Sequence, residues 1–344
     1  MTAYQRLQAD LRSKPRTWLI TGVAGFIGSH LLEALLQLGQ TVVGLDNYST
    51  GSPLNLNDVQ RRVGEEAWAR FLFHRGTVID IGYCREATQH VDYVLHHAGF
   101  VSVPLSIEDP IGCHDANVTG MLNLLVAARD NRVRRVVYAS SSAVYGDDER
   151  LPKVEEQIGR PLSPYGASKL MNEIQARLFL EHYAFESIGL RYFNPFGPRQ
   201  NPRGGYAAVI PQWITALLRG ESCVIHGDGS ITRDFGPVAD VVQANLLAAT
   251  ATSASRLGGV YNVALGAPMR LDELYTRLAA TVAELTGTSP GPAIHRPPRA
   301  GDVQHSGADT SRIQRELGFA PGLGLEAAFT ETARWYQTEL NSRT

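Results

Sequence analysis

The segment SPYGASK sets a phenol and an ammonium group four residues apart, at Tyr165 and Lys169. If the segment is helical, this spacing places both side chains on one face of the helix. A tyrosine with a pKa of about 10 is a weak base at neutral pH. A nearby positive charge stabilises the phenolate and lowers that pKa. The pair therefore indicates acid–base chemistry at a substrate hydroxyl group, although the same spacing also occurs by chance on many helices.

Hydroxyl groups gather at Ser140, Ser141 and Ser142, directly after the apolar run RRVVYA. That run is typical of a buried strand, and ligands of parallel sheets bind at the carboxyl ends of the strands. A hydroxyl at this place can bridge the reacting oxygen of a substrate and a tyrosine. The purely structural alternative for Ser140 or Ser142 is a cap or a hydrogen bond to the backbone.

The stretch ITGVAGFIG places Gly22, Gly25 and Gly28 between a predicted strand and a predicted helix. The first glycine permits a tight turn, the second lets the backbone approach a pyrophosphate, and the third allows close helix packing. Asp46 ends the next predicted strand, where a carboxylate accepts hydrogen bonds from a ribose 2′-hydroxyl and repels a 2′-phosphate. The pattern predicts NAD rather than NADP. The alternative is a set of ordinary turn residues.

The elements that must position these residues alternate along the chain, which predicts a doubly wound parallel sheet of Rossmann type with helices on both faces. The predicted strands are 17–22, 41–46, 91–99, 134–142, 187–194 and 261–265. The predicted helices are 4–13, 26–38, 117–130, 166–183, 206–219, 239–251, 271–286 and 325–340.

A chain of 344 residues exceeds one small domain, and glycine and proline cluster at 195–205 and 287–301. We expect a cofactor domain of residues 1–193 and 236–265. A smaller mixed α/β domain would comprise residues 194–235 and 266–344.

Composition excludes several classes of function. The formal net charge of −2 gives no basic surface for nucleic acid or an acidic membrane. No apolar run approaches the roughly 18 residues of a membrane span, and the N-terminus lacks the apolar region of a signal peptide. Cys84, Cys113 and Cys223 are widely spaced, which predicts buried thiols and no metal site. We expect a cytoplasmic protein.

Taken together, GxxGxxG, SSSAVYG, YGASK and LRYFNPFGPRQ resemble the extended short-chain dehydrogenase/reductase family over residues 16–340. Within that family the chain resembles the nucleotide-sugar 4-epimerases. The resemblance implies tightly bound NAD, catalysis by Ser141, Tyr165 and Lys169, and a homodimer formed through the helix of Tyr165 and its neighbour. It implies as cofactor-binding residues Gly22, Gly25, Phe26, Ile27, Gly28, Asp46, Asn47, Tyr48, Ser49, Thr50, Gly51, Thr77, Val78, His97, Ala98, Gly99, Asn117, Tyr165, Lys169 and Phe193.

The residues after Ser141 separate the possible reactions. Related 4,6-dehydratases and decarboxylating enzymes carry Asp or Glu directly after the catalytic hydroxyl, whereas this chain has Ser142 and Ala143. Without that acid, elimination from a 4-keto sugar lacks its catalyst. We therefore expect a reversible epimerisation at C4.

The smaller domain is expected to bind the nucleotide sugar. The resemblance assigns Arg233 and Arg299 to the diphosphate, since guanidinium groups pair well with phosphate, and Asp302 to a ribose hydroxyl. It implies as substrate-binding residues Ser102, Ser141, Ser142, Tyr165, Asn194, Ala208, Val209, Arg233, Arg299, Asp302 and Ser306. The alternative for each arginine is a solvated surface residue.

Ser306 lies in GDVQHSGAD, where relatives restricted to UDP-glucose and UDP-galactose often carry tyrosine. The small serine leaves room for an N-acetyl group, which predicts interconversion of UDP-N-acetylglucosamine (UDP-GlcNAc) and UDP-N-acetylgalactosamine (UDP-GalNAc). The alternatives are UDP-glucose/galactose, uronic-acid UDP sugars such as UDP-GalNAcA and UDP-GlcNAcA, a non-catalytic NAD-sensing protein and, for Ser306 itself, an inert turn.

The chain departs from the family pattern at Thr77, which replaces the aspartate that holds adenine, at Val101, and at Pro237. Each departure removes one group that relatives use, and none of them touches Ser141, Tyr165 or Lys169.

Overall fold

The computed structural model describes residues 1–203, 207–252, 258–288, 290–298, 304–322 and 324–341. In this part of the chain, a seven-stranded sheet has the order β11-β6-β5-β4-β1-β2-β3, and every neighbouring pair is parallel. The strands are β1 Thr17–Thr21, β2 Thr41–Asp46, β3 Phe71–Arg75, β4 Tyr93–His96, β5 Arg135–Ser141, β6 Ser187–Tyr192 and β11 Val260–Val263. The predicted doubly wound fold is confirmed.

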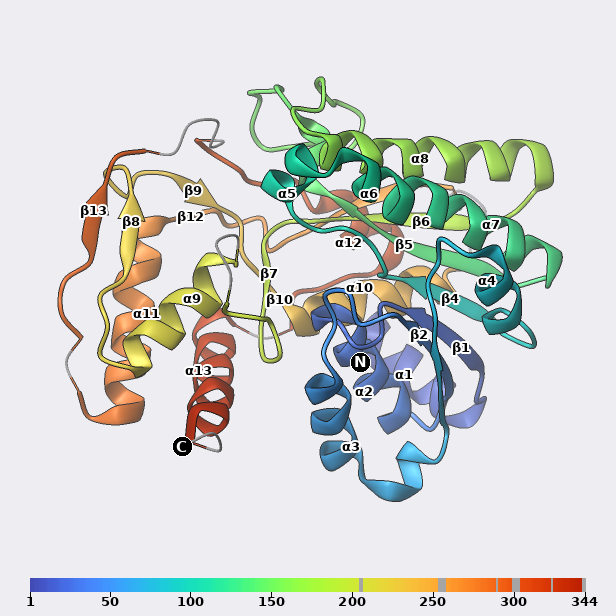
Figure 1. Ribbon diagram of the computed structural model, residues 1–344, viewed down its shortest axis with the longest axis horizontal. Helices are drawn as coiled ribbons and strands as arrows, with labels where there is room; N and C mark the ends of the chain where they lie inside the picture. The colour runs from blue at the N-terminus through green and yellow to red at the C-terminus, as the bar shows by residue number, and fades with distance from the viewer. Residues whose placement is uncertain (204–206, 253–257, 289, 299–303, 323, 342–344) are drawn as a thin grey trace.

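Helices cover both faces of the sheet (Figure 1). One hydrophobic cluster packs α1 Ala3–Ser13, α2 Phe26–Gln37, α3 Pro53–Trp68, α10 Val238–Thr250 and α12 Ser311–Leu317 against one face. A second cluster packs α4 Ile81–Ala87, α7 Gly120–Asp130 and α8 Pro164–Tyr183 against the other face. The short helices α5 Val103–Glu108 and α6 Pro110–His114 lie beside α8 and lead through a π-helix, Asp115–Thr119, into α7.

A separate hydrophobic cluster forms the core of the C-terminal part, which we call the second lobe. It joins α9 Val209–Leu218, α11 Leu271–Thr286 and α13 Leu325–Asn341. Short strand pairs complete this lobe: β8 Val224–His226 with β13 Ile294–Arg296, and β9 Thr232–Arg233 with β12 Met269–Arg270. A further pair, β7 Pro195–Phe196 with β10 Gly236–Pro237, lies where the chain passes between the lobes.

One segment of the C-terminal part packs on the sheet. Ile313 and Leu317 of α12 belong to the cluster that covers the sheet, whereas the sequence had assigned 266–344 to the smaller domain. The division into residues 1–193 and 236–265 against the remainder stays a prediction.

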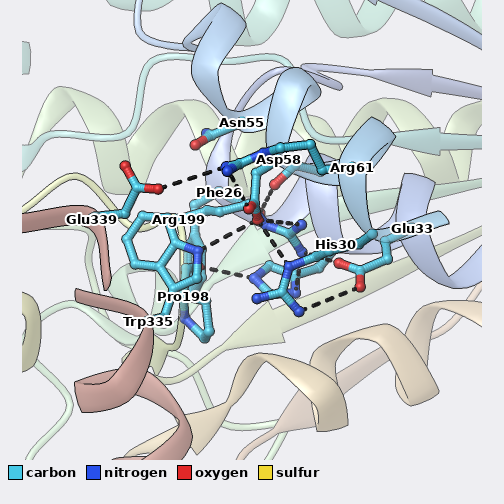
Figure 2. A network of polar contacts seen from close by, with 12 residues as sticks. Phe26, His30, Glu33, Asn55, Asp58, Arg61, Pro198, Arg199, Trp335 and Glu339 are labelled. Carbon is cyan, nitrogen blue, oxygen red and sulfur yellow. Dashed lines mark hydrogen bonds and ion pairs between the residues drawn. The ribbon is translucent and has the colours of Figure 1, made fainter. Parts of the chain in front are cut away.

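A buried polar cluster joins the two lobes (Figure 2). The Arg199 guanidinium, whose side chain is 1% exposed, lies 2.6 Å from a carboxylate oxygen of Glu33 and donates to Nδ1 of His30 at 2.8 Å. Asp58 accepts from Arg199 and, at 3.4 Å, from Nε1 of Trp335. Since these residues come from α2, α3, the segment after β7 and α13, the cluster fixes the second lobe against the helix that follows the glycine turn.

No helix within the described ranges is both long and apolar enough to cross a membrane. The same residues contain no group of three or more His, Cys, Asp or Glu side chains that could hold a metal ion.

Candidate active site

The glycine turn has the close contacts that its sequence predicts. Gly22 has a φ of +71°, and a Cβ atom there would lie 2.6 Å from the backbone nitrogen of Ala98. A Cβ atom at Gly28 would overlap the carbonyl group of Gly22, so the helix packs directly on the turn. Gly25 is the N-cap of α2, and among the described residues no side chain caps this helix. The turn therefore fits a pyrophosphate group.

Asp46 ends β2 beside this turn and is 7% exposed. Its carboxylate accepts hydrogen bonds from the backbone N–H groups of Ala24 at 2.9 Å and Tyr48 at 2.7 Å. Burial raises the pKa of Asp46, and these two bonds act against that rise. Each carboxylate oxygen has a second lone pair, so the group can still accept bonds from a ribose. This acceptor fits the ribose in the adenosine half of NAD.

The loop that follows Asp46 continues along the glycine turn. It contains Asn47, Ser49, Thr50 and Gly51, and a Cβ atom at Gly51 would lie 3.0 Å from Ala24. After β3, the Thr77 hydroxyl accepts the backbone N–H of Ile79 at 3.3 Å, and Val78 is buried in the sheet core. The Thr77 side chain therefore stabilises the turn in which it lies. Relatives carry an aspartate at this position.

Asn117 lies in the π-helix and is 1% exposed. Its side chain accepts from the backbone N–H of Phe100 at 2.7 Å and donates to the Ser168 hydroxyl at 2.9 Å. These bonds fix the turn around Gly99 against α8. A π-turn of this kind is frequent at functional sites, but nothing in the sequence spacing predicted it.

His97 follows β4 and stacks on Tyr192, with ring centroids 5.9 Å apart. Its Nε2 atom lies 3.1 Å from the amide oxygen of Asn245, and burial lowers the pKa of His97 to about 4. The imidazole is therefore neutral at pH 7. Phe193, the last residue of the predicted cofactor set, is buried against Tyr145.

The predicted catalytic residues converge at the carboxyl end of β5. The Lys169 ammonium donates to the backbone carbonyl of Ala139 at 3.0 Å and lies 5.8 Å from the Tyr165 ring centroid. Burial raises the pKa of the Tyr165 phenol, and a hydrogen bond with the Ser141 side chain acts in the opposite direction. Burial lowers the pKa of Lys169 to about 8. Below pH 8 the lysine is mostly charged and can stabilise a tyrosinate.

Local sequence explains why Tyr165 begins this helix. The Ser163 side chain caps α8 by accepting the backbone N–H of Gly166 at 3.0 Å, and Pro164 occupies the first turn. The Tyr165 backbone N–H donates to the Ser106 hydroxyl of α5 at 3.1 Å. These contacts fix the phenol at the N-terminal end of α8.

The three serines have different surroundings. Ser141 is 9% exposed, interacts with Tyr165, and accepts the backbone N–H of Ala143 at 3.1 Å. Ser140 instead donates to the Glu173 carboxylate at 2.6 Å, and Ser142 begins the short 3-10 turn Ser142–Tyr145. The structure thus shows which of the consecutive serines lies beside Tyr165. The positions of the serines in the sequence could not distinguish Ser141 from Ser140.

The predicted substrate residues are distributed around the start of the second lobe. Asn194 has a φ of +36° and donates to the backbone carbonyl of Asp234 at 3.0 Å. Arg233 lies on β9, Ser102 caps α5, and α9 begins at Ala208 and Val209.

Arg299 and Asp302 lie outside the described residues. Pro298 and Gln304, which flank them in the sequence, line a hollow of about 760 Å³ together with Gly227, Asp228 and Arg296.

The segment that contains Ser306 is fixed through its backbone. Ser306 donates its N–H to the carbonyl of Thr232 at 3.2 Å, and Ala308 donates to the Asp234 carboxylate at 3.2 Å. Lys153 donates its N–H to the carbonyl of Gly307 at 2.8 Å. Because these contacts involve main-chain atoms of residues 306–308, a substitution at Ser306 changes the side chain without removing them.

Sequence reasoning missed several buried charged groups, of which Asp234 and Arg191 lie near the site. Asp234 is fully buried and accepts the N–H groups of Leu265, Gly266 and Ala308, which connects β9 to the segment of Ser306. Arg191 lies within the buried strand β6 and pairs with Glu173 at 2.7 Å. A charge inside the apolar run SIGLRYFN was the available signal, since buried charges require partners.

Comparison with known proteins agrees with this geometry. A profile of the NAD dependent epimerase/dehydratase family matches residues 18–264. UDP-glucose 4-epimerase of Mycolicibacterium smegmatis is 35% identical over 325 residues, which cover 93% of this chain and 98% of that protein.

Two solved structures are similar over nearly their whole length. UDP-N-acetylglucosamine 4-epimerase of Methanobrevibacter ruminantium M1, in complex with UDP-N-acetylmuramic acid, has a TM-score of 0.86 and 34% identity, covering 95% of this chain and 99% of that one. UDP-glucose 4-epimerase of Thermotoga maritima, with UDP-glucose, has a TM-score of 0.84 and 32% identity, covering 94% and 99%. The chain belongs to the NAD-dependent epimerase/dehydratase family of the extended short-chain dehydrogenases/reductases.

Proposed function

We propose that this member of the NAD-dependent epimerase/dehydratase family is a UDP-sugar 4-epimerase, and that it interconverts UDP-GlcNAc and UDP-GalNAc. The observation that carries the reaction is the placement of Ser141, Tyr165 and Lys169 together at the carboxyl end of β5, at the edge of a sheet whose glycine turn fits NAD. Ser142 and Ala143 supply no acid for elimination.

The chain's own residues account for the proton transfer. Tyr165 takes the proton of the sugar 4-hydroxyl, the Ser141 hydroxyl bridges the two oxygens, and charged Lys169 favours the tyrosinate. Bound NAD supplies a reversible acceptor for the C4 hydride. The 4-keto sugar then turns over in the site, and Tyr165 returns the proton to the new 4-hydroxyl. Since this hydride acceptor is reversible, the epimerisation would have no net redox change.

The cofactor and nucleotide assignments form part of this proposal. The glycine turn and α2 N-terminus would hold the pyrophosphate, and Asp46 the adenosine ribose. The hollow beside β8 and β13 would take the nucleotide of the substrate, with Arg233 and Arg299 at the diphosphate and Asp302 at the ribose.

Ser306 supports the choice of sugar. Its backbone is fixed, its side chain is small and half-buried, and the room it leaves suits a C2 acetamido group. The solved relatives carry both kinds of name, UDP-N-acetylglucosamine 4-epimerase and UDP-glucose 4-epimerase. The alternatives are therefore UDP-glucose/galactose and uronic-acid UDP sugars. The intact Ser141, Tyr165 and Lys169 set argues against a non-catalytic NAD sensor.

A product assay tests the proposal. Purified protein would be incubated without added NAD, separately with UDP-GlcNAc, UDP-galactose and UDP-GlcNAcA, and the C4 epimers separated by chromatography. We expect the largest kcat/KM for UDP-GlcNAc, with UDP-GalNAc as product. A larger kcat/KM for UDP-galactose or the uronic acid would transfer the proposal to that sugar, and the absence of any epimer would refute it.

We also propose a homodimer formed through α7 and α8. Met171, Ile174 and Leu178 form one stripe on α8 and are 43%, 45% and 43% exposed. Leu122 of the neighbouring α7 is 42% exposed. An apolar stripe on paired helices suits the same stripe of a second copy, because a twofold axis brings identical surfaces together.

A further inference from the structure

A buried ion pair connects the helix of Tyr165 to the strand of Ser141. Glu173 lies one turn beyond Lys169 on α8, and its carboxylate receives two bonds from the Arg191 guanidinium, at 2.9 and 2.7 Å. The same carboxylate accepts the Ser140 hydroxyl at 2.6 Å. The Glu173 and Arg191 side chains are only 8% and 3% exposed. Since Ser140 precedes Ser141 on β5, this carboxylate joins α8, β5 and β6 where the proposed chemistry takes place.

The contacts continue from Arg191 toward the second lobe. The Arg191 guanidinium donates to the Tyr145 hydroxyl at 3.1 Å, and that hydroxyl donates to the side-chain oxygen of Asn262 at 2.6 Å. The Asn262 amide nitrogen donates to the carbonyl groups of Lys153 at 2.9 Å and Asp309 at 3.1 Å. Tyr145 and Asn262 are 2% and 0% exposed.

The last contacts reach the segment that contains Ser306. Lys153 pairs its backbone with Gly307 and Asp309, so Asn262 fixes both sides of this pairing. An unbroken set of buried hydrogen bonds thus runs from Ser140 through Glu173, Arg191, Tyr145 and Asn262 to residues 307–309.

We propose that this network, Ser140–Glu173–Arg191–Tyr145–Asn262, positions the Ser141–Tyr165 pair and the Ser306 segment relative to each other. Its inner part, Glu173 with Arg191, sets the distance between α8 and β5 on which proton transfer depends. Its outer part, Tyr145 with Asn262, sets the place of Ser306 against the sugar. The proposal rests on the proposed epimerase function and adds residues outside the predicted catalytic, cofactor-binding and substrate-binding sets.

The chemistry of the members supports a positioning role. A buried ion pair is weak evidence for stability, because the desolvation of its charges offsets most of their attraction. Hydrogen bonds to charged groups do, however, impose a defined geometry, and Arg191 meets Glu173 through two of them. Small displacements of reacting groups by distant substitutions lower kcat strongly.

The inner part is tested with Glu173→Gln. This variant keeps the side-chain size and leaves Arg191 without its carboxylate, so we expect kcat to fall about 10–100-fold for UDP-GlcNAc and UDP-galactose alike, with little change in KM. The matched control is Glu186→Gln. Glu186 pairs with Arg135 at 2.6 Å, and Arg135 is also buried. This pair lies at the amino-terminal ends of β5 and β6, whereas Ser141 lies at the carboxyl end of β5. We expect the control to lower the melting temperature and to keep kcat.

The outer part is tested with Tyr145→Phe, which removes one hydroxyl and the direct side-chain bridge between Arg191 and Asn262, while Glu155 still accepts hydrogen bonds from both residues. We expect the ratio of kcat/KM for UDP-GlcNAc to that for UDP-galactose to change about tenfold, the usual effect of one lost buried hydrogen bond. The matched control is Tyr261→Phe. Tyr261 is fully buried on β11 next to Asn262, and its hydroxyl donates to Glu316 outside the network. We expect this control to keep the wild-type ratio.

Melting temperatures of all four variants separate positioning from stability. The proposal is overturned if Glu173→Gln keeps the kcat of Glu186→Gln, or if Tyr145→Phe keeps the substrate ratio of Tyr261→Phe. Failure of the proposed function would look different, because the wild-type protein itself would then interconvert neither pair of UDP sugars.

Discussion

Tyr165 is the residue on which the proposed chemistry depends most. Its phenol is held at the start of α8, where burial raises its pKa and the Ser141 hydroxyl acts in the opposite direction. The ammonium of Lys169, 5.8 Å from the ring centroid, and the positive charge of bound NAD would each favour the tyrosinate. Tyr165 can act as a base near neutral pH when these groups together offset the effect of burial on its pKa.

Replacing Tyr165 by Phe should remove the proton-transfer group and little else. We expect kcat for epimerisation to fall by about 10²–10⁴-fold, the usual contribution of a positioned acid or base. The variant should retain the stabilisation by NAD that a thermal shift assay measures for the wild type. Turnover at the wild-type rate would show that another group transfers the proton.

Ser306 carries the prediction about substrate range. A tyrosine there would fill the space proposed for the acetamido group, and overfilling a packed site costs roughly 1–3 kcal/mol. Because each 1.4 kcal/mol is about tenfold, Ser306→Tyr should lower kcat/KM for UDP-GlcNAc by at least about tenfold and spare UDP-galactose. Both substrates should be assayed on the same preparation. An equal loss for both would place the side chain elsewhere than beside C2.

At the residue scale the sequence predicted which groups form the candidate site but not how they are oriented. Tyr165 and Lys169 could be predicted because a four-residue spacing defines a helical face. Ser141 could be distinguished from Ser140 only by resemblance, since three consecutive serines carry no periodic signal. Glu173 and Asp234 could not be assigned, because their partners come from distant segments.

At the element scale, length and burial decided which elements could be predicted. Strands buried on both faces, such as β5 and β6, appear as continuous apolar runs, and the sequence located them. The edge strand β3 was missed because its apolar run of three residues, followed by His74 and Arg75, is too short for a periodic signal. The two- and three-residue strands of the second lobe are too short for any periodicity.

The polar cluster between the lobes (Figure 2) leads to a prediction of how the stability of the protein depends on pH. Burial, followed by the charges of Arg199 and Arg62, holds the pKa of His30 well below its usual value of 6.5, and a hydrogen bond to the Pro198 carbonyl opposes this shift. Glu33 and Asp58 face the same cluster. Because the folded protein binds fewer protons than the unfolded chain below pH 6.5, its stability falls as the pH decreases from 6.5, by at most about 1.4 kcal/mol per pH unit for this group.

We therefore expect His30→Gln to lose less stability than the wild type between pH 6.5 and pH 5. The measurement is the free energy of unfolding by urea at several pH values. His182→Gln, which changes an exposed histidine at the end of α8, is the matched control and should follow the wild type. Identical slopes for His30→Gln and the wild type would remove His30 from the acid response.

At the scale of the whole molecule, the exposed stripe on α8 predicts the assembly. Ile174→Glu places a charge in the centre of the proposed twofold contact, where it would be buried against its own copy. We expect this variant to sediment as a monomer at concentrations where the wild type is a dimer. Ile294→Glu, on an exposed strand of the second lobe, should leave the dimer intact. A monomeric wild type, or a dimeric Ile174→Glu, would contradict the α7–α8 interface.

The two lobes together have to retain the sugar while its C4 centre is inverted. In the proposed mechanism, the hydrogen that leaves C4 as a hydride returns to the same sugar without exchanging with water. UDP-GlcNAc carrying deuterium at C4 tests this most directly, with the product analysed by mass spectrometry and NMR. The account predicts UDP-GalNAc that retains the deuterium at C4 in ordinary water. Product in which C4 has acquired hydrogen from the solvent would contradict it, because the inversion would then proceed by loss of a proton rather than of a hydride.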